Sequence, residues 1–345
     1  MKVRNIAMFD SNREEAEDFI KGLEQSTGLS WEALVHTANN GRKNKLGNAV
    51  RYFKYFTFPF KVFLHRKNYD NVIGWQAFYG LLYAFYCRFF HVKKVNTLLI
   101  KNFTYKPKKG LIGKVYFHFM NYIVKSKYID VFVCTSQTFC DYCAEVFDEP
   151  SERFVYLPFG VNDFTKRVDM SAPSSNDYIL SLGRSNRDWN FLIDSLADTE
   201  YPVRIVCDEL HRDKLPENIQ IFNNVWGDES FVFIKNCKFM IIPIQDGKIG
   251  SGETVLLQAM SFSKPIIITK PSCLADDYVT DCETGLVVSK NKDELIDAVE
   301  KLWNDQELYD RIATNCRTLY ENKHSLLSYG KYVGNTLIEK DCLRR

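Results

Sequence analysis

The sequence predicts an α/β protein with two Rossmann-like, doubly wound parallel-sheet domains that face a cleft. A chain of 345 residues is too long for one ordinary hydrophobic core and indicates about two domains. Short apolar runs alternate with helical patterns, which is typical of βαβ units and parallel sheets. The two halves also differ in charge, since residues 1–165 carry a net charge of +8 and residues 166–345 a net charge of −6.

The composition, 46% hydrophobic and 26% charged, is that of a globular protein. The amino-terminal residues contain no apolar stretch long enough for a secretory signal, so we expect a cytoplasmic protein with reduced cysteines. Cys140 and Cys143 form a close pair but lack the second pair that a structural zinc site requires. We therefore expect them to be buried thiols.

The first domain is expected to cover residues 1–165. Its strands are predicted at 3–10, 69–75, 96–100, 128–136 and 154–158, and helices at 11–25 and 77–90. Residues 72–87 carry no charge, but this run is shorter than the ~20 residues that span a bilayer. A strand followed by a buried helix is the better interpretation.

A segment rich in Pro, Gly, Asn, Asp and Ser, residues 157–177, is expected to link the domains. The second domain then covers residues 166–325, and residues 326–345 are predicted as a C-terminal helix that packs back on the first domain. Within the second domain, strands are predicted at 178–184, 203–207, 219–225, 239–244, 265–269 and 285–289, and helices at 189–198, 228–237 and 292–305.

The stretch DGKIGSGETVLLQAM, residues 246–260, places glycines between a strand and a helix. A helix start offers unpaired N–H groups and a partial positive charge, and glycine lets an anion approach them closely. Arg184 and Arg187 follow another strand of the same domain, and two guanidinium groups suit a diphosphate. The alternatives are a tight turn at the glycines, and arginines paired with Asp188 and Asp194 on the surface.

Residues 42–127 contain 18 basic residues and one acidic residue, with many aromatic residues among them. This mixture suits the headgroup layer of an anionic membrane, and it also suits single-stranded nucleic acid. A solvated basic face above core aromatic residues is the third interpretation.

From about residue 178 to 315 the chain resembles the nucleotide-sugar domain of GT-B glycosyltransferases of the family-4 (group 1) type. The resemblance rests on YILSLGR, GSGETVLLQAMSFSKPIIIT, DDYVTDCETGLVVS and KDELIDAVEKLWND, in that order. It implies transfer of a sugar, of the hexosyl type, from a nucleotide-sugar donor, with UDP favoured. No cofactor and no metal are expected, because no Asp-x-Asp triplet occurs in the chain.

The resemblance also implies a donor site. Its residues are Gly183, Val225, Trp226, Gly250, Ser251, Gly252, Glu253, Thr254 and Gln258, with Arg184 and Arg187 holding the diphosphate. Three positions depart from the family pattern: Gly250 and Gln258 stand where the family usually has Glu, and Trp189 where it has Lys. Arg187 is expected to replace that lysine.

The acceptor is expected to be a glycan or a lipid-linked saccharide bound by the first domain, in bacterial surface polysaccharide synthesis. Residues 51–67 and 105–127 would form a basic, aromatic face on the inner side of the membrane. Asp10, which follows the first strand, is a candidate catalytic base, with helix capping as its other role. The other candidate functions are a sugar-nucleotide epimerase of the same architecture and a nucleic-acid-binding protein, although no nucleic acid partner is expected.

Overall fold

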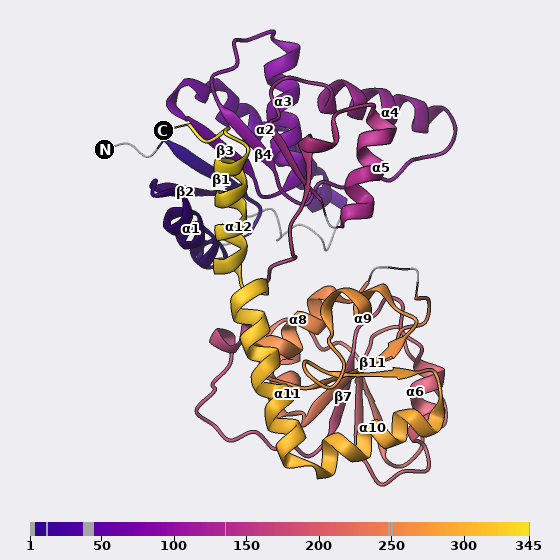
Figure 1. The fold of residues 1–345 in the computed structure, drawn as a ribbon. Coiled ribbons are helices and arrows are strands. Elements are labelled where there is room, and N and C mark those ends of the chain that lie inside the picture. The colour runs from indigo at the N-terminus through magenta and orange to yellow at the C-terminus, as the bar shows by residue number, and fades with distance from the viewer. Residues whose placement is uncertain are drawn as a thin grey trace. The chain divides into compact units, whose positions relative to one another are not determined.

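The computed structural model describes residues 4–11, 13–36, 45–134, 136–247, 249 and 251–344. The chain forms two compact units, Met1–Gly160 with Leu326–Arg345, and Val161–Ser325. Each unit is a twisted parallel sheet with helices on its faces (Figure 1), as the sequence predicted. The boundary falls after Gly160, before residue 165, because most of the expected linker belongs to the second unit: the ring of Phe164 lies 4.6 Å from that of Phe231.

The first domain contains a six-stranded sheet in the order β2-β1-β3-β4-β5-β6, in which every pairing is parallel. Its strands are β1 (Asn5–Phe9), β2 (Trp31–Val35), β3 (Asn71–Gly74), β4 (Thr97–Ile100), β5 (Val131–Cys134) and β6 (Phe154–Tyr156). Strands β1, β3, β4 and β5 are buried along their whole length, which explains their continuous apolar sequence. The edge strand β2 is mostly half-exposed and was not predicted.

Helices cover both faces of this sheet (Figure 1). They are α1 (Glu14–Thr27), α2 (Lys45–Leu64), α3 (Ala77–Phe89), α4 (Gly110–Val124), α5 (Gln137–Phe147) and α12 (Leu326–Glu339). Most aromatic side chains of α2 and α4 pack against the core, including those of Tyr55, Phe58, Phe60 and Phe63. The basic segment therefore supplies core residues as well as surface residues.

The C-terminal helix α12 lies along α1 (Figure 1). Two glycines permit this close approach: a Cβ on Gly22 would lie 2.1 Å from the carbonyl oxygen of Leu327, and a Cβ on Gly330 would lie 2.3 Å from that of Phe19. Both distances are far below a van der Waals contact. Residues 326–345 thus belong to the first domain, although they follow the second in sequence.

The second domain contains a six-stranded parallel sheet in the order β12-β11-β10-β7-β8-β9. Its strands are β7 (Ile179–Leu182), β8 (Val203–Val206), β9 (Ile219–Phe222), β10 (Phe239–Ile242), β11 (Ile266–Lys270) and β12 (Leu286–Ser289). Its helices are α6 (Trp189–Leu196), α7 (Asp228–Asn236), α8 (Glu253–Ser261), α9 (Cys273–Tyr278), α10 (Lys292–Asn304) and α11 (Gln306–Leu319), followed by a π-helical turn, η5 (Tyr320–His324). The strand order reverses between β7 and β10.

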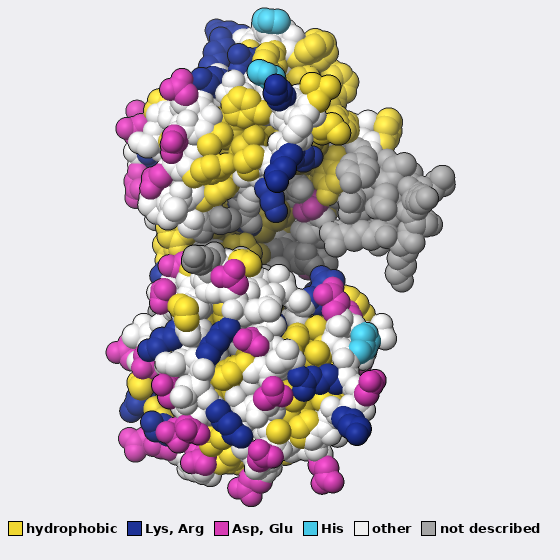
Figure 2. All heavy atoms as spheres, turned by 90° about the vertical axis from the view of Figure 1, so that its right-hand side faces the viewer, with side chains coloured by type: hydrophobic (Ala, Val, Ile, Leu, Met, Phe, Trp, Pro, Cys, Tyr) yellow, Lys and Arg dark blue, Asp and Glu magenta, His cyan; other side chains and the backbone are white. Residues whose placement is uncertain are grey.

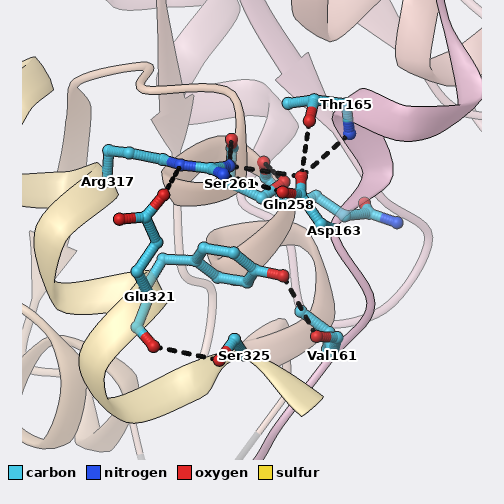
Figure 3. Close-up of polar contacts among 9 residues, drawn as sticks. Val161, Asp163, Thr165, Gln258, Ser261, Arg317, Glu321 and Ser325 are labelled. Atoms are coloured by element: carbon cyan, nitrogen blue, oxygen red, sulfur yellow. Dashed lines mark hydrogen bonds and ion pairs between the residues drawn. The ribbon is translucent and has the colours of Figure 1, made fainter. Parts of the chain in front are cut away.

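Arg317 on α11 holds the segment by which the chain enters the second domain (Figure 3). Its Nη2 lies 2.7 Å from Oδ2 of Asp163, and its Nε donates to Glu321 at 2.7 Å. The hydroxyl of Tyr320 donates to the carbonyl oxygen of Val161. The N–H of Val161 in turn donates to the carbonyl oxygen of His324. The segment that enters this domain near Val161 is therefore hydrogen-bonded to the segment that leaves it near His324.

Among the described residues, no helix is long and apolar enough to cross a membrane. The uncharged run that begins in β3 continues as α3, a helix whose buried residues include Leu82 and Tyr83. Cys140 and Cys143 are both buried with free thiols, as expected.

Candidate functional site

A pocket of about 490 Å³ opens in the second domain at the point where the strand order reverses. In parallel α/β sheets, ligands bind beyond the carboxyl ends of the strands at such a switch point. The pocket is lined by residues that follow β7, β8 and β9 and by the first turns of α8. These lining residues include Gly183, Arg184, Arg187, Val225, Trp226, Ser251, Gly252, Thr254 and Gln258.

The start of α8 faces this pocket with bare backbone. Gly252 occupies the N-cap position with φ +115, a left-handed conformation that glycine adopts at little cost. It provides no side chain to accept from the first N–H groups, which have no acceptor inside the helix. These donors and the positive end of the helix dipole are available to an anion.

Arg187 is the central cation of the pocket. Its side chain is only 6% exposed, and its Nη1 donates to the carbonyl oxygen of Ser185 at 2.9 Å. Its Nε is buried and has no hydrogen-bond partner in the described part of the chain. Burial lowers the pKa of Arg187 to about 10, and the Glu253 carboxylate acts in the opposite direction. The side chain therefore remains charged at neutral pH, with donor capacity that the protein leaves unused.

Two glycines make room for this guanidinium group. A Cβ on Gly183 would lie 3.0 Å from Nη2 of Arg187, and a Cβ on Gly252 would lie 2.9 Å from the same atom. Both glycines have positive φ angles. The turn after β7 and the start of α8 thus enclose the arginine from two sides, and they leave it beside the exposed N–H groups of the helix.

The acidic residues that could have neutralised the two arginines have other partners. Asp188 accepts from Lys290 Nζ at 2.9 Å and caps α6 through the N–H of Phe191. Asp194 forms an ion pair with Arg212 at 3.5 Å. Surface salt bridges to Asp188 and Asp194 therefore do not explain Arg184 and Arg187.

Arg184 lies at the open side of the pocket. Its guanidinium carbon is 5.5 Å from the ring centroid of Trp226, which is 55% exposed. Thr254 and Gln258 project from one face of α8 because they are four residues apart. A charged group, a flat aromatic face and two polar side chains thus border one cavity, which suits a ligand with a phosphate part and a ring part.

Two predicted residues lie outside this pocket lining, and a third is not described. Gly250 is outside the described residues. Glu253 is not among the residues that line the pocket, although its carboxylate acts on Arg187. Asp10 lies in the first domain after β1; the N-cap of α1 is Arg13, so Asp10 does not occupy the capping position.

The residues that the end of β8 contributes to the pocket were not predicted from the sequence. Val206, Cys207 and Asp208 line it there, and Oδ1 of Asp208 accepts from the N–H of Asn224 at 2.7 Å. An Asp directly after a buried strand was the available signal. Among the described residues, no cluster of three His, Cys, Asp or Glu side chains could hold a metal ion.

Residues 206–319 match the family model for glycosyl transferases of group 1. This part of the second domain is therefore similar to the glycosyl transferases of group 1. The matched residues supply Trp226, Gly252, Thr254 and Gln258 to the pocket, whereas Gly183, Arg184 and Arg187 precede the match.

Two curated proteins are similar to parts of this chain. An uncharacterized glycosyltransferase of Methanocaldococcus jannaschii is 28% identical over 136 residues, which cover 36% of this chain and 37% of that protein. O-antigen chain mannosyltransferase C of Escherichia coli is 23% identical over 210 residues, which cover 55% of this chain and 53% of that protein. The chain therefore matches less than two thirds of the length of either relative.

The fold of the whole chain is similar to that of solved GT-B structures. The structure of Anabaena HepE in complex with UDP superposes with a TM-score of 0.61 at 12% identity, covering 98% of this chain and 100% of that chain. Each of the two domains of this chain thus has the parallel-sheet α/β fold found in those structures.

Proposed function

We propose that the protein is a metal-independent glycosyltransferase that moves a sugar from a UDP-sugar to a saccharide acceptor. The observation that carries the proposal is the buried guanidinium of Arg187, enclosed by Gly183 and Gly252 beside the uncapped start of α8. A diphosphate fits this arrangement, because it can accept from the guanidinium and from the helix N–H groups together.

The residues of the pocket suggest how the reaction proceeds. An acceptor hydroxyl attacks the anomeric carbon, the glycosidic bond to the diphosphate breaks, and the nucleoside diphosphate leaves with the negative charge. Arg184, Arg187 and the α8 N–H groups stabilise that charge without reorganisation, since they are already in place. The Trp226 face is available to the nucleoside, and Gln258 to a ribose hydroxyl.

Asp10 is the proposed base for the acceptor hydroxyl. It follows the carboxyl end of β1 in the first domain, the edge of a parallel sheet at which ligands bind. An Asp10→Asn variant that retains more than about a tenth of the wild-type turnover removes this role, because general-base catalysis contributes at least about a hundredfold.

A thermal-shift screen of UDP-, GDP- and ADP-sugars tests the donor proposal. A ligand that binds only the native state raises the melting temperature, so UDP-sugars are expected to give the largest shift. Product analysis completes the test: sugar transfer to an acceptor supports a transferase, whereas conversion of the nucleotide sugar without an acceptor identifies an epimerase. No shift with any of the three classes contradicts donor binding.

We further propose that the acceptor is lipid-linked and that the first domain meets the inner face of an anionic membrane. Large apolar side chains are exposed there beside lysines: Phe53 is 69% exposed on α2, and Leu111 and Ile112 are 77% and 75% exposed on α4. In the view of Figure 2, basic and hydrophobic side chains lie together over part of the first domain and acidic ones lie along its other edge, whereas acidic and basic side chains are mixed on the second domain. The named O-antigen relative supports a role in surface polysaccharide synthesis.

Sedimentation with vesicles tests the membrane proposal. The protein is expected to pellet with phosphatidylglycerol vesicles at low salt and to remain in solution with phosphatidylcholine vesicles. A Leu111→Ser/Ile112→Ser double variant is expected to pellet less, because it removes exposed apolar area without touching the core. Equal sedimentation with both vesicle types contradicts the proposal.

A further inference from the structure

A second pocket lies in the first domain, where α3 and α4 end. Its volume is about 490 Å³, and its lining includes the ionisable side chains of Arg88, His91, Lys125 and Lys127. No Asp or Glu is among the described residues that line it. These residues precede β4 and β5, so the pocket lies at the opposite edge of the sheet from Asp10, and the proposed transfer reaction does not use it.

Ser126 makes this pocket more than a basic surface. It lines the cavity, its residue is only 2% exposed, and its Oγ is buried without a hydrogen-bond partner among the described residues. A buried hydroxyl without a partner costs free energy, whereas a ligand oxygen can satisfy it. A polar occupant that reached the Ser126 hydroxyl would supply the missing partner.

The ends of helices usually repel anions through their free carbonyl groups, but here arginines occupy those carbonyls. Arg88 Nη1 donates to the carbonyl oxygen of Tyr122, and its guanidinium lies 4.2 Å from the Tyr122 ring centroid. Arg153 donates to the carbonyl oxygens of Val124 and Ser126 at 3.0 and 3.1 Å. Because Arg153 is itself paired with Glu149, the excess positive charge at the pocket comes from Arg88, Lys125 and Lys127.

Two of the cations keep donors for a ligand. Arg88 uses one of its five N–H groups in the hydrogen bonds recorded among the described residues. Lys127 is exposed, with the Tyr128 ring centroid 5.8 Å from its Nζ. Lys125 is less available, because its Nζ lies 3.1 Å from Oδ2 of Asp148, although that carboxylate is 94% exposed and weakly held.

We propose that this pocket binds a phosphoryl group, with Arg88 and Lys127 as charged donors and Ser126 as the buried hydroxyl partner. A tetrahedral anion with several acceptor oxygens can meet a planar guanidinium, an ammonium and a hydroxyl together. The source is a soluble phosphate or the headgroup of a phospholipid. Exposed Phe89 and Phe90, which directly precede His91, would contact the acyl layer in the second case.

The first arm of the test uses inorganic phosphate and the full chain, with binding followed by calorimetry. A Ser126→Ala/Lys127→Gln double variant is expected to bind phosphate at least about tenfold more weakly. Lys21→Gln, an equal charge change on α1 of the same domain, is the matched control and is expected to bind as the wild type does. An Arg187→Met variant, which alters only the proposed donor pocket, is also expected to keep this binding.

The second arm uses vesicles of phosphatidylglycerol and phosphatidylcholine with the same variants. Loss of vesicle binding in the double variant alone, with no binding of inorganic phosphate, identifies a lipid headgroup as the source. Two results overturn the proposal: neither probe binds, or Lys21→Gln weakens binding as much as the double variant. If phosphate binding is lost only in Arg187→Met, the phosphate site lies in the second domain. That result also overturns the proposal, and it does so whichever nucleotide sugar is the donor.

Discussion

The Nη2 atom of Arg187 lies 2.9 Å from the place where a Cβ on Gly252 would stand. The two residues come from different strand-to-helix connections, after β7 and after β10, which are neighbours in the sheet. Sheet order thus brings a cation against the start of α8, and the absence of one side chain makes the approach possible.

Gly252→Ala is expected to weaken UDP binding by at least about tenfold, because the new methyl group displaces the guanidinium and strains a residue with φ +115. Calorimetric titration with UDP measures the effect. Gly28→Ala is the matched control: its φ is +68, nothing lies within 4 Å of the added Cβ, and it is in the first domain. Equal affinity in both variants would mean that the Arg187–Gly252 contact is unimportant for the donor.

Arg184→Ala and Arg187→Ala are each expected to raise the donor KM or to lower kcat by at least about tenfold, since each removes a charged hydrogen-bond donor. The structure separates the two: Arg187→Ala should also change the melting temperature, because it removes a buried charge and leaves a cavity, whereas a change at exposed Arg184 should not. Steady-state kinetics together with thermal unfolding distinguish these outcomes. Wild-type kinetics in both variants would rule out the diphosphate clamp.

Lys101 is expected to make stability depend on pH above neutrality. Its Nζ is buried 3.6 Å from the Trp75 ring centroid, and burial lowers its pKa to about 7, partly opposed by Asp10. The unfolded chain, with a lysine pKa near ~10.4, then binds more protons than the native state between about pH 7 and 10, so the free energy of unfolding rises with pH in that window.

Lys101→Met removes this titration. As the pH rises from 7 to 9.5, the free energy of unfolding of the wild type is expected to increase by about 2 kcal/mol or more relative to that of the variant. Urea unfolding at several pH values measures the difference, in which the other titrating groups cancel. A constant difference across the window would show that Lys101 is not a titrating buried cation.

Asp163→Asn is expected to destabilise the second domain by about 1–3 kcal/mol, because it breaks the ion pair with Arg317. Burial opposes ionisation of Asp163, but hydrogen bonds from Arg317 and Thr165 outweigh it and lower the pKa of the carboxyl group. The stabilisation is therefore present above the unfolded pKa and is lost as the pH falls through the folded pKa.

A double-mutant cycle with Arg317→Met measures the coupling of this pair. Asp148→Asn, at an ion pair with a 94% exposed carboxylate, is the control and is expected to change the free energy of unfolding by less than about 0.5 kcal/mol. A cycle without coupling would show that Arg317 does not fasten the entry segment.

Most strands could be predicted from the sequence because they are short apolar runs, and six of them are buried along their whole length. β2 could not, since this edge strand buries only Trp31 fully and alternates weakly. The aromatic residues of α2 were expected on a membrane-facing surface, but several pack in the core, because periodicity alone does not say which face of a helix a sheet covers. Among the aromatic side chains of α2 that the structure describes, Phe53 and Phe56 are exposed.

Part of the candidate site could likewise be predicted from the sequence, and part could not. Arg184, Gly252 and Gln258 carried a recognisable pattern, and the structure brings them to one pocket. Asp208 was missed because its place depends on β8 lying beside β7, and strand order is set by tertiary packing. The enclosure of Arg187 by two glycines was equally hidden, since it joins residues far apart in sequence.

Calorimetric titration of the full chain with UDP, compared with Arg187→Met, tests the central claim most directly. Saturable binding to the wild type that weakens at least about tenfold in the variant is the predicted result, since Met keeps most of the buried volume and removes the charged donors. UDP binding of equal strength in the two proteins, or no binding of UDP, GDP or ADP to the wild type, would contradict a diphosphate site at the start of α8.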